Sequence, residues 1–203
     1  VRIITSLSLG VVVLASVSWL GLGHVSGKIA RISVFAGLDN RPEKTSKALN
    51  YLLVGSDTRE GLTKEQMKAL RVGSTKTAAG GRSDTMLLVH ISKARDKAYL
   101  VSLPRDTLET IPAHTSTDGK SQIPDRQNKL NAAFAFGGAP LLIQTVEGAT
   151  NLKIDHYIEV SFAGFAGIVD ALGGVDVCTK VDIDDPKSHL VLAAGTHTLG
   201  GIE

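Results

Sequence analysis

The sequence predicts an α/β protein, an α-β-α sandwich with a central mixed sheet, preceded by one N-terminal transmembrane helix. Three observations support this fold class: a long uncharged stretch at the start, apolar runs of strand length further on, and helix-forming segments between those runs. Strands that alternate with helices are typical of α/β domains. The 203 residues are enough for one ordinary domain and an anchor.

The uncharged stretch covers residues 3–25, which contain no Asp, Glu, Lys or Arg. A helix of this length is roughly 35 Å long and crosses the hydrocarbon core of a bilayer. A cleaved secretion signal is the alternative, but it has a shorter apolar region and a small-residue cleavage site. We therefore expect an uncleaved anchor at residues 1–25, followed by a juxtamembrane connector at 26–47. Either interpretation exports the remaining domain, residues 48–203.

The first half of that domain is expected to contain three strands and one helix. Residues 48–54 form an apolar run that predicts a buried strand, and residues 63–72 have an amphipathic helical pattern. Two further apolar runs, 85–91 and 98–103, are separated by six polar residues and predict a hairpin.

The second half begins with residues 108–128, a polar segment whose prolines and glycine predict a long loop. A helix over 130–136 is interrupted by Gly137-Gly138, and Pro140 suits the first turn of the helix that follows. The remaining elements are a strand at 156–160, a helix at 162–172 closed by Gly173-Gly174, and a strand at 175–177.

Composition excludes several classes of function. The net charge of +2 and the lack of a helix-turn-helix or zinc-finger pattern argue against nucleic-acid binding. The single cysteine, Cys178, has no partner for an intramolecular disulfide and no Cys or His neighbour at metal-site spacing. We expect it to be a small buried hydrophobic residue.

Aspartate and arginine recur together at the edges of three predicted strands. Asp57 follows the first strand, and Asp84 precedes the second. If these strands are neighbours, the two carboxylates can share one Mg²⁺, which accepts one or two protein carboxylates together with phosphate oxygens. The alternative is that both aspartates form Asx-turns in loops.

The arginines of these segments suit phosphate binding. Arg82 lies two positions before Asp84, and Arg105 follows Pro104. A guanidinium binds phosphate with two parallel hydrogen bonds, whereas lysine acts as a point charge. The alternative is a surface salt bridge to Asp84 or Asp106, which contributes little.

A third group of candidates lies at the start of the helix over 130–136. Lys129 and Asn131 can add donors to the backbone N–H groups of that helix terminus, where anions bind. The alternative is a routine terminus, with Asn128 as the cap and Lys129 in solvent.

Together these residues resemble the LytR-CpsA-Psr family, with features of its actinobacterial branch. The resemblance covers roughly residues 48–201. The matching stretches are LLVGSD at 52–57, GRSDTM at 81–86, SLPRDT at 102–107, KLNAAF at 129–134, VSFAGF at 160–165 and VDALGGV at 169–175.

The resemblance implies a membrane-anchored phosphotransferase of Gram-positive bacteria whose catalytic domain is extracellular. Such an enzyme moves a glycopolymer from a polyprenyl-pyrophosphate carrier to a peptidoglycan sugar hydroxyl during cell wall assembly. It also implies that Asp57 and Asp84 bind Mg²⁺ and that Arg82 and Arg105 hold the pyrophosphate. Asp106 or a metal-binding aspartate is expected to take the proton from the acceptor hydroxyl.

The sequence departs from the family pattern in two places. The family has an Arg-x-Arg pair after the segment matched by residues 195–201, whereas this sequence stops at Glu203, so we expect a domain incomplete at its C-terminus. Actinobacterial relatives often pair the cysteine at position 178 with one near His197, where this chain has Thr196. A non-catalytic polyprenyl-pyrophosphate-binding or regulatory protein and a pyrophosphohydrolase are the alternative functions.

Overall fold

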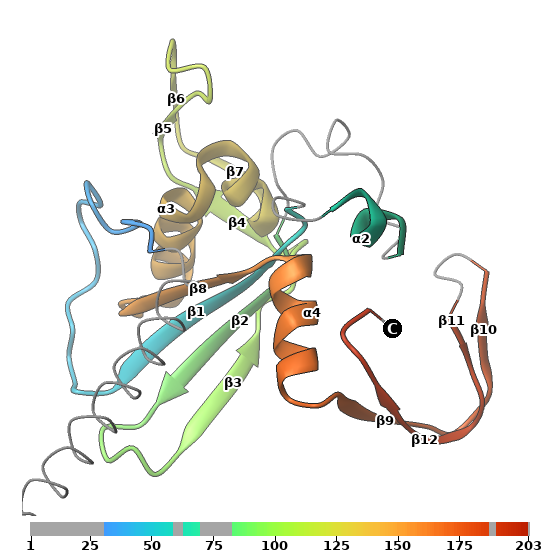
Figure 1. The fold of residues 1–203 in the computed structure, drawn as a ribbon. Coiled ribbons are helices and arrows are strands. Elements are labelled where there is room, and N and C mark those ends of the chain that lie inside the picture. The colour runs from blue at the N-terminus through green and yellow to red at the C-terminus, as the bar shows by residue number, and fades with distance from the viewer. Residues whose placement is uncertain (1–30, 59–62, 70–82, 187–189, 203) are drawn as a thin grey trace, which may run out of the picture. The chain divides into compact units, whose positions relative to one another are not determined.

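The computed structural model describes residues 31–58, 63–69, 83–186 and 190–202. The chain divides into a unit of residues 1–36 and a unit of residues 37–203, and the described helices and strands all belong to the second unit (Figure 1). The expected anchor at 1–25 lies outside the described residues. None of the helices that the structure describes is long and apolar enough to cross a membrane.

A four-stranded mixed sheet forms the centre of the second unit, with the strand order β3-β2-β1-β8. β1 runs antiparallel to β2 and parallel to β8, so the predicted mixed sheet is confirmed. The predicted hairpin is also confirmed, as the antiparallel pair of β2 and β3. The elements of this sheet are β1 (Leu49–Ser56), β2 (Ser83–Ile91), β3 (Ala98–Ser102) and β8 (His156–Val160).

One face of the sheet is buried against helix α3 (Leu130–Thr150). Every second residue of β1 is buried, as expected for a strand with one face toward the core. Leu52 and Val54 on this face pair with Leu88 and Met86 of β2, and all four are at most 4% exposed. The helix α4 (Phe162–Ala171) contacts β8, while the three-layer sandwich remains a prediction.

Helix α3 contains the break predicted at the glycine pair. Gly137 and Gly138 have non-helical backbone angles, and Gly138 has φ 64° and ψ −156°, a region that is essentially limited to glycine. Pro140 follows in the second part of the helix. The N–H groups in the first turn after the break have no partner within the helix. The lack of an N–H group on Pro140 therefore costs no helical hydrogen bond.

The prediction of a long loop over 108–128 was wrong. This segment folds into two short antiparallel ladders, because its polar residues satisfy their backbone groups across strands, and Ile111 is fully buried at the end of one of them. The strands are β4 (Leu108–Ile111), β5 (His114–Thr115), β6 (Gln122–Ile123) and β7 (Arg126–Lys129).

The remaining described elements are short. They are the helix α2 (Lys64–Ala69), which agrees with the helix predicted there, and the strands β9 (Val175–Thr179), β10 (Ile183–Asp185), β11 (Leu190–Leu192) and β12 (Gly195–Leu199). The prediction that Cys178 is buried was wrong, because β12 is the only described strand that pairs with β9, and this side chain is exposed. Cys178 is opposite Thr196 in that pair.

Candidate functional site

A β-bulge at the start of β2 sets the position of Asp84. Gly55 pairs with Thr85 and Ser56 pairs with Ser83, so Asp84 is the extra residue on the β2 side. The strict alternation of the strand is lost there: Ser83 is buried, Asp84 and Thr85 are both exposed, and Met86 is buried again. Bulges commonly re-aim a side chain at the edge of a sheet. Here the bulge keeps the carboxylate of Asp84 in solvent.

The same strand pair brings the second aspartate to this edge. Asp57 follows Ser56 directly, and Ser56 is the partner of Ser83, the residue before Asp84. The two aspartates are therefore each adjacent in sequence to a member of one strand pair, Ser56 and Ser83. The Oγ atoms of Ser56 and Thr58, on either side of Asp57, are hydrogen-bonded at 2.8 Å. The two strands that flank these aspartates are therefore neighbours in the sheet, which is the condition for a shared site.

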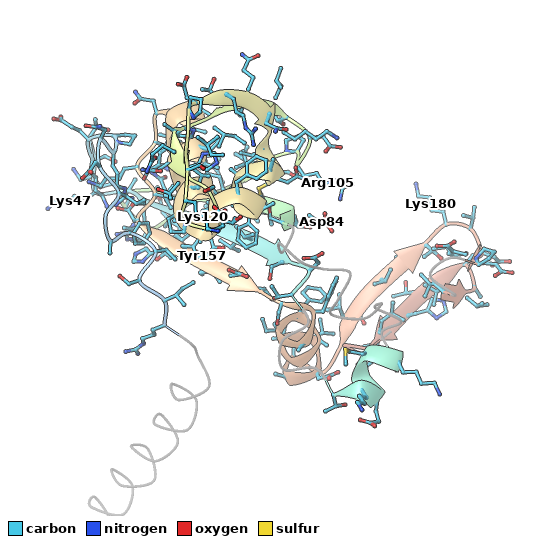
Figure 2. The ribbon with its side chains drawn as sticks, turned by 90° about the horizontal axis from the view of Figure 1, so that it is seen from above. Lys47, Asp84, Arg105, Lys120, Tyr157 and Lys180 are labelled. Atoms are coloured by element: carbon cyan, nitrogen blue, oxygen red, sulfur yellow. The ribbon has the colours of Figure 1, made fainter. Side chains whose placement is uncertain are left out.

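Arg105 reaches this edge from the loop after β3. Its Nη1 donates to Asp84 Oδ1 at 2.5 Å, and both side chains are 50% exposed. The Leu103 N–H donates to Met86 O, which extends the pairing with β2 to the start of the loop. A half-exposed ion pair contributes little to stability. The pair does, however, leave a carboxylate and a guanidinium side by side at an accessible position (Figure 2).

The first turn of α3 holds this loop from the other side. The N–H groups of Leu130 and Asn131 donate to the carbonyls of Thr107 and Arg105, at 2.8 and 3.0 Å. The first N–H groups of a helix have no partner within the helix. In α3 these two groups fix the Arg105 loop, so they are not available for the anion contact that the sequence suggested. The N-cap is Lys129, and Asn128 is the last-but-one residue of β7.

A second ion pair joins the same two segments. Lys129 Nζ lies 3.0 Å from Asp106 Oδ1, with both side chains more than half exposed. The hydrogen bond from Lys129 lowers the pKa of Asp106 below its ordinary value, against the small opposing effect of desolvation. A lower pKa makes this carboxylate a weaker proton acceptor.

The structure thus assembles most of the residues that the sequence singled out. Asp57, Asp84 and Arg105 gather at one edge of the sheet, and Asp106 and Lys129 are joined next to Arg105. Asn131 contributes its backbone N–H to the same loop. Arg82 lies outside the described residues.

Sequence reasoning missed Thr107. Its N–H and its hydroxyl both donate to Pro104 O, at 3.0 and 2.8 Å, and its own carbonyl accepts from Leu130. These bonds close the turn that presents Arg105. The segment alone gave no clear signal, because proline marks a turn from its second position, and Pro104 is the first residue of this one.

The donor set at the edge fits a divalent cation bound together with a phosphate. Mg²⁺ is usually held by one or two carboxylates plus substrate phosphate oxygens rather than by an all-protein cage. No group of three or more His, Cys, Asp or Glu residues suited to a metal occurs among the described residues. The adjacent guanidinium suits phosphate oxygens.

The fold and this edge define an α/β protein with a carboxylate and guanidinium site at the end of a mixed sheet. The LytR_cpsA_psr family model matches residues 26–203, and the chain belongs to this family. The resemblance seen in the sequence is therefore confirmed.

Curated relatives include proteins of cell wall synthesis. The chain is 40% identical over 152 residues to a probable cell wall biosynthesis protein LcpB of Corynebacterium glutamicum, covering 75% of this chain and 33% of the relative. It is 31% identical over 172 residues to a polyisoprenyl-teichoic acid–peptidoglycan teichoic acid transferase TagU of Bacillus anthracis, covering 84% of this chain and 54% of the relative. The chain thus spans between a third and about half of these relatives.

Solved structures show the same fold. One is a LytR-CPS2A-psr family protein, YwtF (TagT), with bound octaprenyl pyrophosphate lipid. Its TM-score is 0.54 at 26% identity, and the match covers 86% of this chain and 57% of that one.

Proposed function

We propose that the chain is the catalytic part of a membrane-anchored phosphotransferase for cell wall assembly. Its substrate is a glycopolymer carried on polyprenyl pyrophosphate, and its acceptor is a sugar hydroxyl of peptidoglycan. The observation that carries the proposal is the contact between Asp84 and Arg105, at the edge of the sheet where Asp57 follows the end of β1. Membership of the family and the names of the relatives support it.

The reaction exchanges the phosphoanhydride bond of the pyrophosphate for a phosphate ester bond. The acceptor hydroxyl oxygen forms a bond to the phosphorus next to the glycopolymer, and the bond from that phosphorus to the bridging oxygen breaks. Polyprenyl phosphate leaves with the bridging oxygen, and the hydroxyl proton passes to a base. The products are a phosphodiester between glycopolymer and peptidoglycan and the lipid monophosphate.

The residues of the edge have distinct roles in this proposal. Arg105, together with Arg82, binds non-bridging phosphate oxygens and stabilises the charge of the transition state. Asp57 and Asp84 would hold Mg²⁺, which neutralises pyrophosphate charge when bound. The proton acceptor is Asp106 or one of these two aspartates. The hydrogen bond from Lys129 lowers the pKa of Asp106, which makes this carboxylate a weaker base than an ordinary aspartate.

The polyprenyl chain needs an apolar surface. Helix α4 and its C-cap residue expose Phe165, Ile168 and Leu172 at 61%, 50% and 73%. Exposed apolar side chains that are grouped on one element often mark an interaction site. We assign the lipid tail to the apolar surface of the domain, and the anchor at residues 1–25 places the domain at the membrane that carries this lipid.

A transfer assay tests the proposal. The reconstituted chain is incubated with a polyprenyl-pyrophosphate oligosaccharide, a peptidoglycan fragment and Mg²⁺, and the phosphodiester product is followed by mass spectrometry. We expect product that requires Mg²⁺ and is lost in Asp84→Ala and Arg105→Ala. Tight binding of the lipid without any product would instead identify a binding protein, and release of free oligosaccharide phosphate would identify a hydrolase.

A further inference from the structure

A basic surface lies at the end of the sheet opposite the Asp84–Arg105 edge. It lines an open cavity of about 620 Å³ formed by the segment before β1 and the turn between β2 and β3. We call this surface the basic pole and define it by its four cations, Lys44, Lys47, Lys93 and Arg95. Figure 2 shows Lys47 on the far side of the domain from Asp84 and Arg105.

The register of the sheet builds the basic pole. Leu49 pairs with Ile91, so the residues before β1 meet the turn that follows β2. That turn is closed by backbone hydrogen bonds from Ser92 to Lys97 O and from Arg95 to Ser92 O, at 2.9 and 3.0 Å. The cations of the turn therefore have a fixed place beside those of the entering chain.

Two ion pairs hold the entering chain on the domain. Arg41 Nη2 lies 2.7 Å from the buried Glu147 carboxylate, and Lys44 Nζ lies 2.5 Å from Asp155 Oδ1. Asp155 also accepts from the Asn50 N–H, which links it to β1. The segment that carries Lys44 and Lys47 is thus part of the folded surface.

The charge of the basic pole is only partly balanced. Lys44 is paired with Asp155, whereas Lys47, Lys93 and Arg95 have no ion pair with any residue that the structure describes. The other lining residues are Thr45, Ser46 and Leu49, so two hydroxyls and no carboxylate face the cavity in the described part of the chain. Exposed cations with nearby hydroxyl donors suit phosphate oxygens.

We propose that the basic pole docks on the anionic phospholipid headgroups of the membrane in which the chain is anchored. The inference rests on the anchoring in the proposed function. Chain continuity favours a lipid surface as the partner, because Lys47 is the last residue of the connector at residues 26–47, which directly follows the predicted anchor. Such a tether keeps the pole at a high effective concentration near the headgroups.

Docking would also orient the domain. β1 runs from the basic pole at Leu49 to the site edge at Ser56, and eight residues of strand span roughly 25 Å. The Asp84–Arg105 edge then faces away from the lipid surface, toward the acceptor. Because the two regions lie at opposite ends of β1, substitutions at the pole leave the site residues unchanged.

Lysine footprinting tests the docking. The full chain is reconstituted into vesicles of phosphatidylcholine alone or mixed with phosphatidylglycerol, and labelled with a membrane-impermeant amine reagent. We expect Lys47 and Lys93 to be labelled about fivefold more slowly on the anionic vesicles, the effect of one cation held near an anionic surface. Lys120 and Lys180, which are exposed elsewhere, are internal controls and should be labelled equally on both.

The labelling rate of Lys93 is then measured in charge-reversed variants. Lys47→Glu with Arg95→Glu should abolish the protection of Lys93, while the matched variant Lys120→Glu with Lys180→Glu should retain it. Equal labelling of Lys93 on both vesicles, protection that survives the pole variant, or equal protection by soluble inorganic phosphate would each overturn the proposal.

Insertion is measured separately, by flotation of the vesicles at high salt. A chain that does not insert contradicts the anchoring of the proposed function. For a chain that does not insert, anionic vesicles are added to the protein in solution and the labelling of Lys93 is measured again. This measurement still decides whether the basic pole binds phospholipid. The two failures are therefore distinguishable.

Discussion

Arg105 donates a hydrogen bond to Asp84 at 2.5 Å, which joins the loop after β3 to the bulged start of β2. The two residues are 21 positions apart and lie at the open end of one hairpin, where β2 begins and β3 has ended. The carbonyl of Arg105 is in turn held by the first turn of α3. The loop is therefore fixed at both sides, while the guanidinium itself remains half exposed and accessible to a ligand.

Replacement of Arg105 by lysine should strongly reduce transfer. Lysine keeps the charge but loses the planar fork that binds two phosphate oxygens. We expect Arg105→Lys to lower the transfer rate by about 100-fold, comparable to the loss of one donor to a developing anion. Arg126→Lys is the matched control, because Arg126 of β7 lies over the ring of Phe136 of α3. This variant should stay close to the parent rate. Equal rates for all three proteins would exclude a phosphate contact by Arg105.

The break in α3 should respond oppositely to two alanine substitutions. Gly138 has a backbone conformation that a side chain strains, so Gly138→Ala should lower the free energy of unfolding by about 1–3 kcal/mol. Gly148 is in the regular part of the helix, with nothing within 4 Å of an added Cβ. Gly148→Ala should therefore stabilise the protein by up to about 1 kcal/mol. Denaturant unfolding of both variants measures the contrast, and a neutral Gly138→Ala would show that the break is not needed.

Glu147 should be essential for stability. It is 2% exposed and accepts from Arg41 and from the Ile154 N–H, at 2.7 Å each. Glu147→Gln removes the carboxylate that balances the Arg41 charge, and we expect a loss of about 2–3 kcal/mol, reduced from the value for a fully buried pair because Arg41 is partly exposed. Lys44→Gln breaks a more exposed pair and should cost less than about 1 kcal/mol. Similar losses in the two variants would contradict this ranking.

Acid should weaken the fold through Asp155. Burial raises the pKa of this carboxyl, but the hydrogen bonds from Lys44 and from the Asn50 N–H outweigh burial and hold it below its ordinary value of 3.8. A depressed pKa in the folded state means that the stabilisation is present above pH 3.8 and is lost as the pH falls through the folded pKa. The difference in unfolding free energy between the parent and Asp155→Asn should be constant near neutral pH and shrink below pH 3.8. A difference that grows on acidification would have the wrong sign.

The sequence predicted the parts of the fold that depend on local patterns. The apolar runs of β2 and β3 with a polar turn between them, and the glycine pair in α3, determine local structure wherever they occur. The hairpin over 108–129 was missed because its residues are polar and its pairing depends on partners outside each strand. The buried Glu147 was missed for the same reason, since its partner Arg41 is 106 positions away.

The site was predictable by residue type but not by geometry. Asp57, Asp84 and Arg105 were identified because carboxylates and guanidiniums recur at the edges of predicted strands. The bulge that turns Asp84 outward depends on the register of two strands and has no signal in β2 alone. Likewise, the helix terminus at Leu130 was expected to bind an anion, and only the tertiary structure shows that it binds the carbonyls of Arg105 and Thr107.

The most direct test of the central claim measures binding of octaprenyl pyrophosphate to the reconstituted chain with and without Mg²⁺. If Asp84 and Arg105 serve one pyrophosphate, Mg²⁺ should strengthen binding to the parent protein, and Asp84→Asn should remove that dependence. Arg105→Gln should weaken binding under both conditions by about 10-fold or more, as expected for a charge-assisted hydrogen bond. Parent-like affinity and an unchanged response to Mg²⁺ in both variants would contradict the assignment of this edge as the pyrophosphate site.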